Sequence, residues 1–116
     1  MTDSLSQTTK IAIFKGKKVR KTIHNNEWWF SVVDVVQALT DQTDNTTARK
    51  YWNKLAQRLR DEGGEVVTNC HRLKLKASDN KLRETDCSNT EGIFRIIQST
   101  PSYRRNLQGH VWHDAK

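Results

Sequence analysis

The residues best suited to bind a partner lie between Thr46 and Arg60, in the segment TTARKYWNKLAQRLR. On a helix at about 100° per residue, apolar side chains fall on one face of this segment and polar side chains on the other. The apolar face has Ala48, Tyr51, Trp52, Leu55 and Leu59, and the polar face has Arg49, Lys50, Asn53, Lys54, Gln57, Arg58 and Arg60. Basic and amide side chains contact phosphates and base edges. The pattern predicts a helix that faces nucleic acid, although a solvated surface helix would have the same pattern.

A second acid-free group of cations lies before this helix. Between Ser4 and Asn26 the basic residues are Lys10, Lys15, Lys17, Lys18, Arg20 and Lys21. The whole chain has a net charge of +7, which favours a polyanionic partner such as DNA, RNA or an anionic membrane surface. Segregation of the cations favours a binding surface over charge that serves solubility alone. A basic hairpin can grip phosphates, or its lysines can protect a sheet edge, and both interpretations stay open.

Other chemistry lacks the required spacing. Cys70, His71 and Cys87 do not reproduce a zinc-binding pattern. Asp34 is expected to cap a helix, and the acids near residues 79–86 match no nuclease motif. We therefore expect a protein that is not an enzyme and that needs no metal or cofactor.

Targeting signals are absent from the sequence. No apolar run approaches the ~20 residues that a membrane span needs. The N-terminus, MTDSLSQTT, lacks the layout of a signal peptide. With two cysteines and no mark of secretion, we expect reduced thiols, a cytoplasmic location in a bacterial host, and no membrane partner.

Residue patterns predict an α+β fold, with small antiparallel β-hairpins or a sheet packed against three or more short helices. Alternating and β-prone residues predict strands at 11–14, 19–23 and 28–30, a second hairpin at 73–85, and a less defined strand around 66–67. Trp52 is expected in the core, and one of Trp28 and Trp29 is expected at the surface because neighbouring strand residues point to opposite faces.

Capping residues and stripes of apolar residues in the sequence predict three helices. Ser31 is expected to cap a valine-rich helix that continues to Leu39. Asn45 or Thr46 is expected to cap the basic helix, which Gly63 and Gly64 end. A third helix follows residues 88–90 and ends at Pro101. The predicted organisation is a flexible tail at 1–9, a folded domain at 10–101, and a tail or short helix at 102–116.

Two sequence blocks resemble the BRO N-terminal domain (Bro-N) family, of the prophage antirepressor type. They are EWWFSVVDVVQAL at 27–39 and TEGIFRIIQS at 90–99, the second followed by Pro101. The resemblance implies a small α+β DNA-binding module, as found in large DNA viruses and in phage and prophage antirepressors. After Pro101 the family continues with a helix containing a Phe and a Trp, and here only Trp112 matches, so residues 102–116 depart from the pattern. The separate C-terminal domain of antirepressors is not expected in this chain.

Charge clusters and resemblance together predict a DNA-binding regulatory module at 10–101, with double-stranded DNA as its partner. The expected phosphate contacts are Lys17, Lys18, Arg20, Lys21, Lys50, Lys54 and Arg58, and the expected base-edge contacts are Arg49, Asn53 and Gln57. The alternative is an antirepressor that binds a phage repressor protein directly, without contacting DNA. Binding of RNA or single-stranded DNA, and a homo-oligomeric state, stay open.

Overall fold

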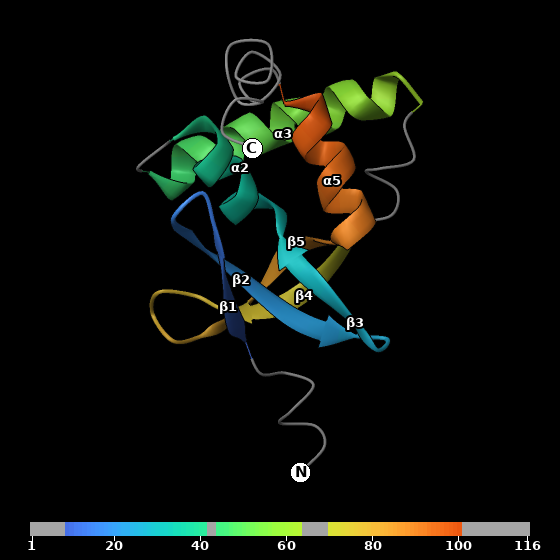
Figure 1. The fold of residues 1–116 in the computed structure, drawn as a ribbon. Helices are drawn as coiled ribbons and strands as arrows, with labels where there is room; N and C mark the ends of the chain where they lie inside the picture. The colour runs from blue at the N-terminus through green and yellow to red at the C-terminus, as the bar shows by residue number, and fades with distance from the viewer. Residues whose placement is uncertain (1–8, 42–43, 64–69, 101–116) are drawn as a thin grey trace, which may run out of the picture.

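The computed structural model describes residues 9–41, 44–63 and 70–100, and in these ranges it has one five-stranded antiparallel sheet and three helices (Figure 1). The α+β class predicted from the sequence is confirmed. The elements are β1 (Lys10–Phe14), β2 (Lys17–His24), β3 (Glu27–Ser31), α2 (Val32–Thr40), α3 (Asn45–Asp61), β4 (His71–Lys76), β5 (Leu82–Asn89) and α5 (Thr90–Ser99). The strand expected around 66–67, the predicted tail at 102–116 and all but Thr9 of the predicted tail at 1–9 lie outside the described residues.

The first three strands form a meander with two tight turns. Lys15 and Gly16 join β1 to β2 with φ of 53° and 75°, and Asn25 and Asn26 join β2 to β3 with φ of 53° and 64°. Two consecutive residues with positive φ define a type I′ turn, whose twist matches that of antiparallel strands. Glycine and asparagine adopt this conformation readily, so these local residues fix the register of the meander.

Pairing of β3 with β5 completes the sheet in the order β1-β2-β3-β5-β4. The sheet also curls, because the end of β4 returns to the first two strands. The Lys76 amide donates to Thr9 Oγ1 at 2.9 Å, and the Lys76 carbonyl accepts from Arg20 at 3.2 Å. Within the sheet, Trp29, Leu75 and Cys87 form a buried cluster. Trp29 is therefore the buried member of the tryptophan pair, and Trp28 is half-buried.

The helices begin at polar caps. Ser31 Oγ accepts from the Asp34 amide at 3.3 Å, as predicted for α2. For α3 the expected cap was wrong. Asp44 caps the helix, accepting from the amides of Thr46 and Thr47 at 3.1 and 3.3 Å, because a carboxylate satisfies two orphan amides and favours the positive helix end. Asn89 caps α5 by accepting from the Gly92 amide at 3.0 Å.

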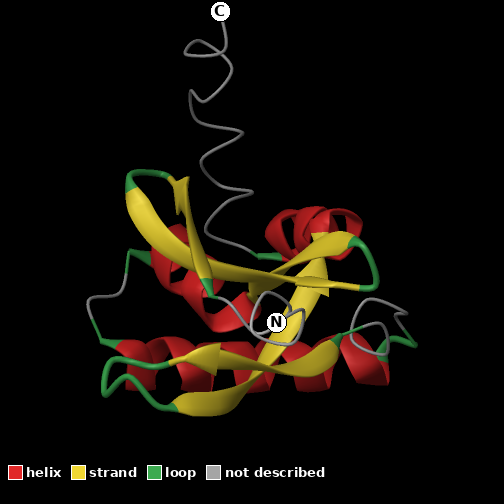
Figure 2. Ribbon diagram, turned by 90° about the horizontal axis from the view of Figure 1, so that it is seen from below, coloured by secondary structure: helices red, strands yellow, loops and turns green. Residues whose placement is uncertain are grey.

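The main core lies where α2 packs against α3 and α5. Its members include Val32, Val36, Trp52, Leu55 and Ile96, each at most 4% exposed. Trp52 is thus in the core, as predicted. Valines lower the helix propensity of α2, so this burial on several sides stabilises it. The three helices gather on one side of the sheet (Figure 1), and α3 and the β4–β5 hairpin overlap when the molecule is seen from below (Figure 2).

Within the ranges that the structure describes, the helices are all too short or too polar to traverse a lipid bilayer.

Candidate nucleic-acid interface

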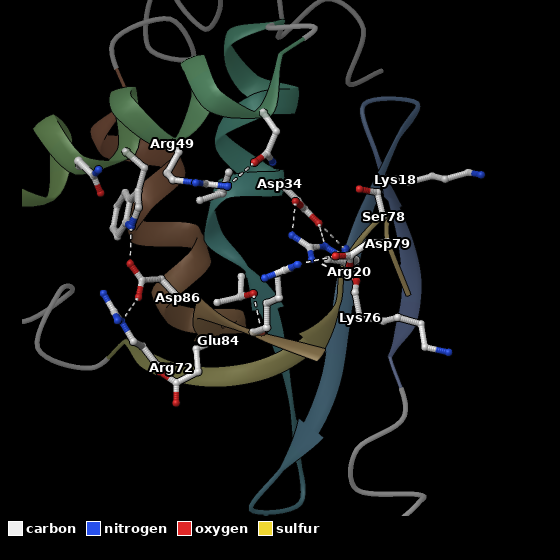
Figure 3. Close-up of a pocket in the computed structure, with 17 residues that line it drawn as sticks. Lys18, Arg20, Asp34, Arg49, Arg72, Lys76, Ser78, Asp79, Glu84 and Asp86 are labelled. Atoms are coloured by element: carbon white, nitrogen blue, oxygen red, sulfur yellow. Dashed lines mark hydrogen bonds and ion pairs between the residues drawn. The ribbon is translucent and has the colours of Figure 1, made fainter. Parts of the chain in front are cut away.

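An open groove of about 1080 Å³ lies between α3 and the β4–β5 hairpin. Asn45, Arg49, Trp52 and Asn53 line it from the helix (Figure 3). Lys18 and Arg20 of β2 and Asp34 of α2 line one end, and the hairpin contributes Arg72, Lys76, Ser78, Asp79, Arg83, Glu84 and Asp86. Both basic and acidic side chains line the groove. A cation that already pairs with one of the acids is less able to bind a phosphate, so the ion pairs of each cation determine its availability.

Arg20 makes most of its hydrogen bonds within the fold. Its Nε donates to Asp34 Oδ2 at 2.8 Å and its Nη2 to Asp34 Oδ1 at 3.0 Å, while the Arg20 amide also donates to Oδ2 at 2.9 Å. The two side chains are 22% and 10% exposed. The hydrogen bonds that Arg20 donates to Asp34 raise the pKa of the guanidinium, although burial acts in the opposite direction. This two-pronged pair ties β2 to the first turn of α2.

This arrangement weighs against one expectation about the site and corrects another. The sequence predicts Arg20 as a phosphate contact, but its guanidinium also donates to Ser31 Oγ and to the Lys76 carbonyl, at 3.4 and 3.2 Å. A carboxylate that already binds the guanidinium competes with a phosphate for the same donors. Asp34 was expected to serve its helix cap, but its carboxylate binds Arg20 instead, and only its amide takes part in the cap.

The polar face of α3 is exposed, as the helical pattern predicts. Arg49, Lys50, Asn53, Lys54, Gln57, Arg58 and Arg60 are exposed, and Ala48, Trp52, Leu55 and Leu59 are buried. The exposed side chains differ in their contacts. Arg49 and Asn53 line the groove, whereas Lys50 and Lys54 have no ion-pair partner among the described residues. Arg58 donates to the Ser99 carbonyl at 3.1 Å and lies 4.0 Å from Glu62, so it is partly engaged at the end of α5.

The cations of the first hairpin do not form one surface. Lys17 Nζ lies 3.0 Å from Asp41 Oδ1, and the hydrogen bond from Lys17 lowers the pKa of the Asp41 carboxyl. Lys21 Nζ lies 4.0 Å from the centroid of the Trp28 ring, in a cation–π contact. Of the four predicted contacts from this hairpin, Lys18 is the groove-lining lysine without a charged partner among the described residues.

The second hairpin contributes groove residues that the sequence-based prediction missed. Arg72 Nε lies 3.3 Å from Asp86 Oδ1, and Asp86 Oδ2 accepts from the Trp52 indole at 2.9 Å, which joins β5 to α3. Arg83 of β5 pairs with Asp79 of the turn before it. Lys76 and Glu84 also line the groove (Figure 3). Five basic residues between positions 72 and 83 were a visible signal, but their position beside α3 depends on the long-range pairing of β5 with β3.

Metal and thiol chemistry receive no support from the described part of the chain. No group of three or more His, Cys, Asp or Glu side chains there could hold a metal ion. Burial raises the pKa of Cys70 to about 11 and that of Cys87 to about 12, so both thiols stay protonated near neutral pH.

A comparison with protein families adds an independent finding. The model of the BRO family, N-terminal domain, matches residues 18–113, which run from β2 through α5 and beyond the boundary expected at Pro101. Neither the curated proteins nor the solved structures include a match to this chain.

Proposed function

We propose that this chain, which belongs to the family of BRO N-terminal domains, is a DNA-binding regulatory module of the phage antirepressor type. Its partner is double-stranded DNA in the cytoplasm of a bacterial host, and its activity is binding without catalysis. The observation that supports this most is the exposed face of α3, which has no acid from Asn45 to Arg60 and borders a groove with further cations.

The ion pairs and hydrogen bonds of each side chain indicate its expected role in DNA binding. Lys50 and Lys54, exposed and without ion-pair partners among the described residues, supply phosphate contacts, and Lys18 adds one from β2. Arg49 and Asn53 are placed in the groove, where a guanidinium and an amide can read base edges. Arg49 donates to Asn45 Oδ1 at 3.0 Å, an exposed neutral partner that guanine can replace. Gln57 donates to Asp61 Oδ1 at 3.0 Å and is less available.

A salt series on duplex DNA tests the proposal. Each phosphate contact contributes about −0.9 to the slope of log affinity against log salt concentration, so Lys18, Lys50 and Lys54 alone predict a slope of roughly −3. Charge reversal by Lys50→Glu or Lys54→Glu should weaken binding and flatten this slope. Lys10→Glu makes the same charge change at an exposed position on β1, outside the groove, and serves as the matched control. A flat slope for the unaltered protein, or equal losses for Lys10→Glu and Lys50→Glu, contradicts the proposal.

The same variants separate DNA binding from direct binding of a phage repressor. If repressor capture accounts for function, Lys50→Glu and Lys54→Glu should leave it intact, and nuclease treatment should not reduce it. Competition between duplex and single-stranded DNA of one sequence then tests the preference for duplex.

A further inference from the structure

We infer that the free edge of β1 is a self-association surface, on which β1 of a second copy of this chain pairs antiparallel around Ala12. This inference is independent of the proposed DNA binding. Strand β1 is at one end of the strand order, and its only sheet neighbour among the described residues is β2. It reads Lys10-Ile11-Ala12-Ile13-Phe14, without a proline and with its single charge at the first position. Lys10 is a charge of the kind that protects sheet edges, but the rest of the strand has no charge, and it has no proline that would prevent pairing.

Turn geometry identifies which backbone groups are free. Phe14 and Lys17 flank the two-residue turn, and in such hairpins the flanking residues exchange both main-chain hydrogen bonds. Because bonded and non-bonded pairs alternate, Ala12 directs its N–H and C=O toward Val19 of β2. Ile11 and Ile13 therefore direct theirs outward. Among the described residues, nothing forms a hydrogen bond with these outward groups.

The same two residues also expose apolar side chains. Ile11 is 50% exposed and Ile13 is 67% exposed, and both lie on one face of β1 because side chains alternate along a strand. They are the two most exposed members of their residue type in the described ranges. Phe14, on the opposite face, packs against the core with Val19. The free backbone edge and the exposed isoleucines thus coincide at two positions.

A second copy is the occupant because this strand is complementary to itself. With a two-fold axis at Ala12, Ile11 of each copy lies opposite Ile13 of the other, so each outward N–H meets an outward C=O. The four isoleucines then lie on one face within about 5 Å of their cross-strand neighbours. Lys10 lies opposite Phe14 of the second copy and not opposite another lysine.

Two physical properties of this dimer follow. One short strand pair covers less area than the ~1,200 Å² of the smallest stable interfaces, so the association is weak, with a dissociation constant of about 100 μM or higher. Each copy has a net charge of +7, so added salt should strengthen association by screening repulsion between copies. Salt dependence of this sign is opposite to that of phosphate binding, so DNA binding and self-association fail or succeed separately.

Sedimentation equilibrium of the full chain tests the surface. The apparent mass should rise toward two copies at concentrations of about 500 μM, and more so at high salt. Ile13→Lys should weaken association about tenfold or more. Ile23→Lys, at a 37% exposed position on inner strand β2, is the matched control and should have no effect. If circular dichroism shows that Ile13→Lys is unfolded, Ile13→Thr keeps a β-branched side chain and should still weaken association. A monomer at every concentration, or equal effects at the two isoleucines, overturns the inference.

Disulfide trapping tests the register directly. In the proposed pairing the two Ala12 Cα atoms are about 4.5–5.5 Å apart, within disulfide reach, whereas the two Lys10 Cα atoms are roughly 13 Å apart. Ala12→Cys should therefore form a covalent dimer much faster than Lys10→Cys. The native thiols compete little at pH 8, because burial raises the pKa of Cys70 to about 11 and of Cys87 to about 12. Equal cross-linking rates at positions 10 and 12 would overturn the proposed register.

Discussion

Asp34 holds Arg20 within the fold, and we expect Arg20 to stabilise the fold instead of contacting DNA, which predicts a specific outcome for Arg20→Ala. The substitution removes both prongs of the pair with Asp34 and the donors to Ser31 and to the Lys76 carbonyl. The Asp34 carboxylate, which is 10% exposed, keeps only the Arg20 amide from that strand. A nearly buried carboxylate without its cation makes the folded state less favourable.

The size of the effect follows from the burial of the pair. Removing one partner of a buried ion pair costs about 3–5 kcal/mol. The Arg20 side chain is 22% exposed, so water can partly replace it, and the expected loss in free energy of unfolding is about 3 kcal/mol. This is a large part of the ~5–15 kcal/mol that stabilises an ordinary domain, so the variant should remain folded only at low temperature.

Urea unfolding followed by tryptophan fluorescence measures this loss. Asp34→Ala should cost a similar amount, and the double variant should lose about 2 kcal/mol less than the sum of the two, because neither charge is then left alone. Lys18→Ala is the matched control. It lies two residues away on β2, is exposed, and should change stability by less than about 0.5 kcal/mol.

Two results would refute the reasoning about Arg20. One is an Arg20→Ala variant as stable as Lys18→Ala. The other comes from DNA binding, where removal of a true phosphate contact lowers the magnitude of the salt slope by about 1. We expect that reduction for Lys18→Ala and no reduction for Arg20→Ala, measured below its unfolding temperature. The reverse result would make Arg20 a DNA contact and the Asp34 pair incidental.

Three further predictions concern separate sites. A Cβ added at Gly92 would lie 1.9 Å from Ser88 Oγ, so Gly92→Ala should lower the free energy of unfolding by about 2–3 kcal/mol in urea, and Ser88→Ala should recover part of that loss. Burial raises the pKa of Cys87 from 9.0 to about 12. Below pH 9 this thiol is protonated in both the folded and unfolded states, so it causes no pH-dependent loss of stability. Between pH 9 and about 12 only the unfolded state loses the proton, and the free energy of unfolding falls by about 1.4 kcal/mol per pH unit. Unfolding measurements from pH 8 to 11 should show a shallower decline for Cys87→Ala, and an identical decline would contradict the assignment. Glu84→Gln removes a groove carboxylate that has no ion-pair partner among the described residues, so duplex affinity at low salt should rise about two- to threefold; an unchanged affinity would place the DNA away from the hairpin.

Most individual elements could be predicted because their signals are local. Alternation in β1 and β2, the apolar stripe of α2 and the polar face of α3 each lie within a few residues of one another. The cap of α3 shows the limit of such signals, because Asn45 or Thr46 was predicted and Asp44 is observed. All three residues favour a cap, and only the observed start of the helix distinguishes them.

The site was less predictable because it depends on contacts far apart in sequence. Ser31 pairs with Cys87, and this register places the β4–β5 hairpin across the groove from α3. The sequence shows the cations of that hairpin but not their position. It likewise shows Arg20 and Asp34 without indicating that the turn at Asn25 and Asn26 aligns β2 with β3, which leads directly into α2, so that these two side chains meet.

Ion pairing separates the arginines of this chain from its lysines, and this difference affects which cations can bind DNA. Among the described residues, five arginines form ion pairs, but Lys17 is the one lysine that does; the paired arginines are Arg20, Arg58, Arg72, Arg83 and Arg95. A guanidinium can fit a carboxylate with two parallel hydrogen bonds, as Arg20 does with Asp34, which suits arginines to ion pairs within a fold. The lysines left over act as point charges, which attract phosphates without reading sequence. If the proposed DNA binding holds, the affinity therefore comes mainly from lysines, and base discrimination depends on the few groove residues, Arg49 and Asn53, whose donors are not held by an acid.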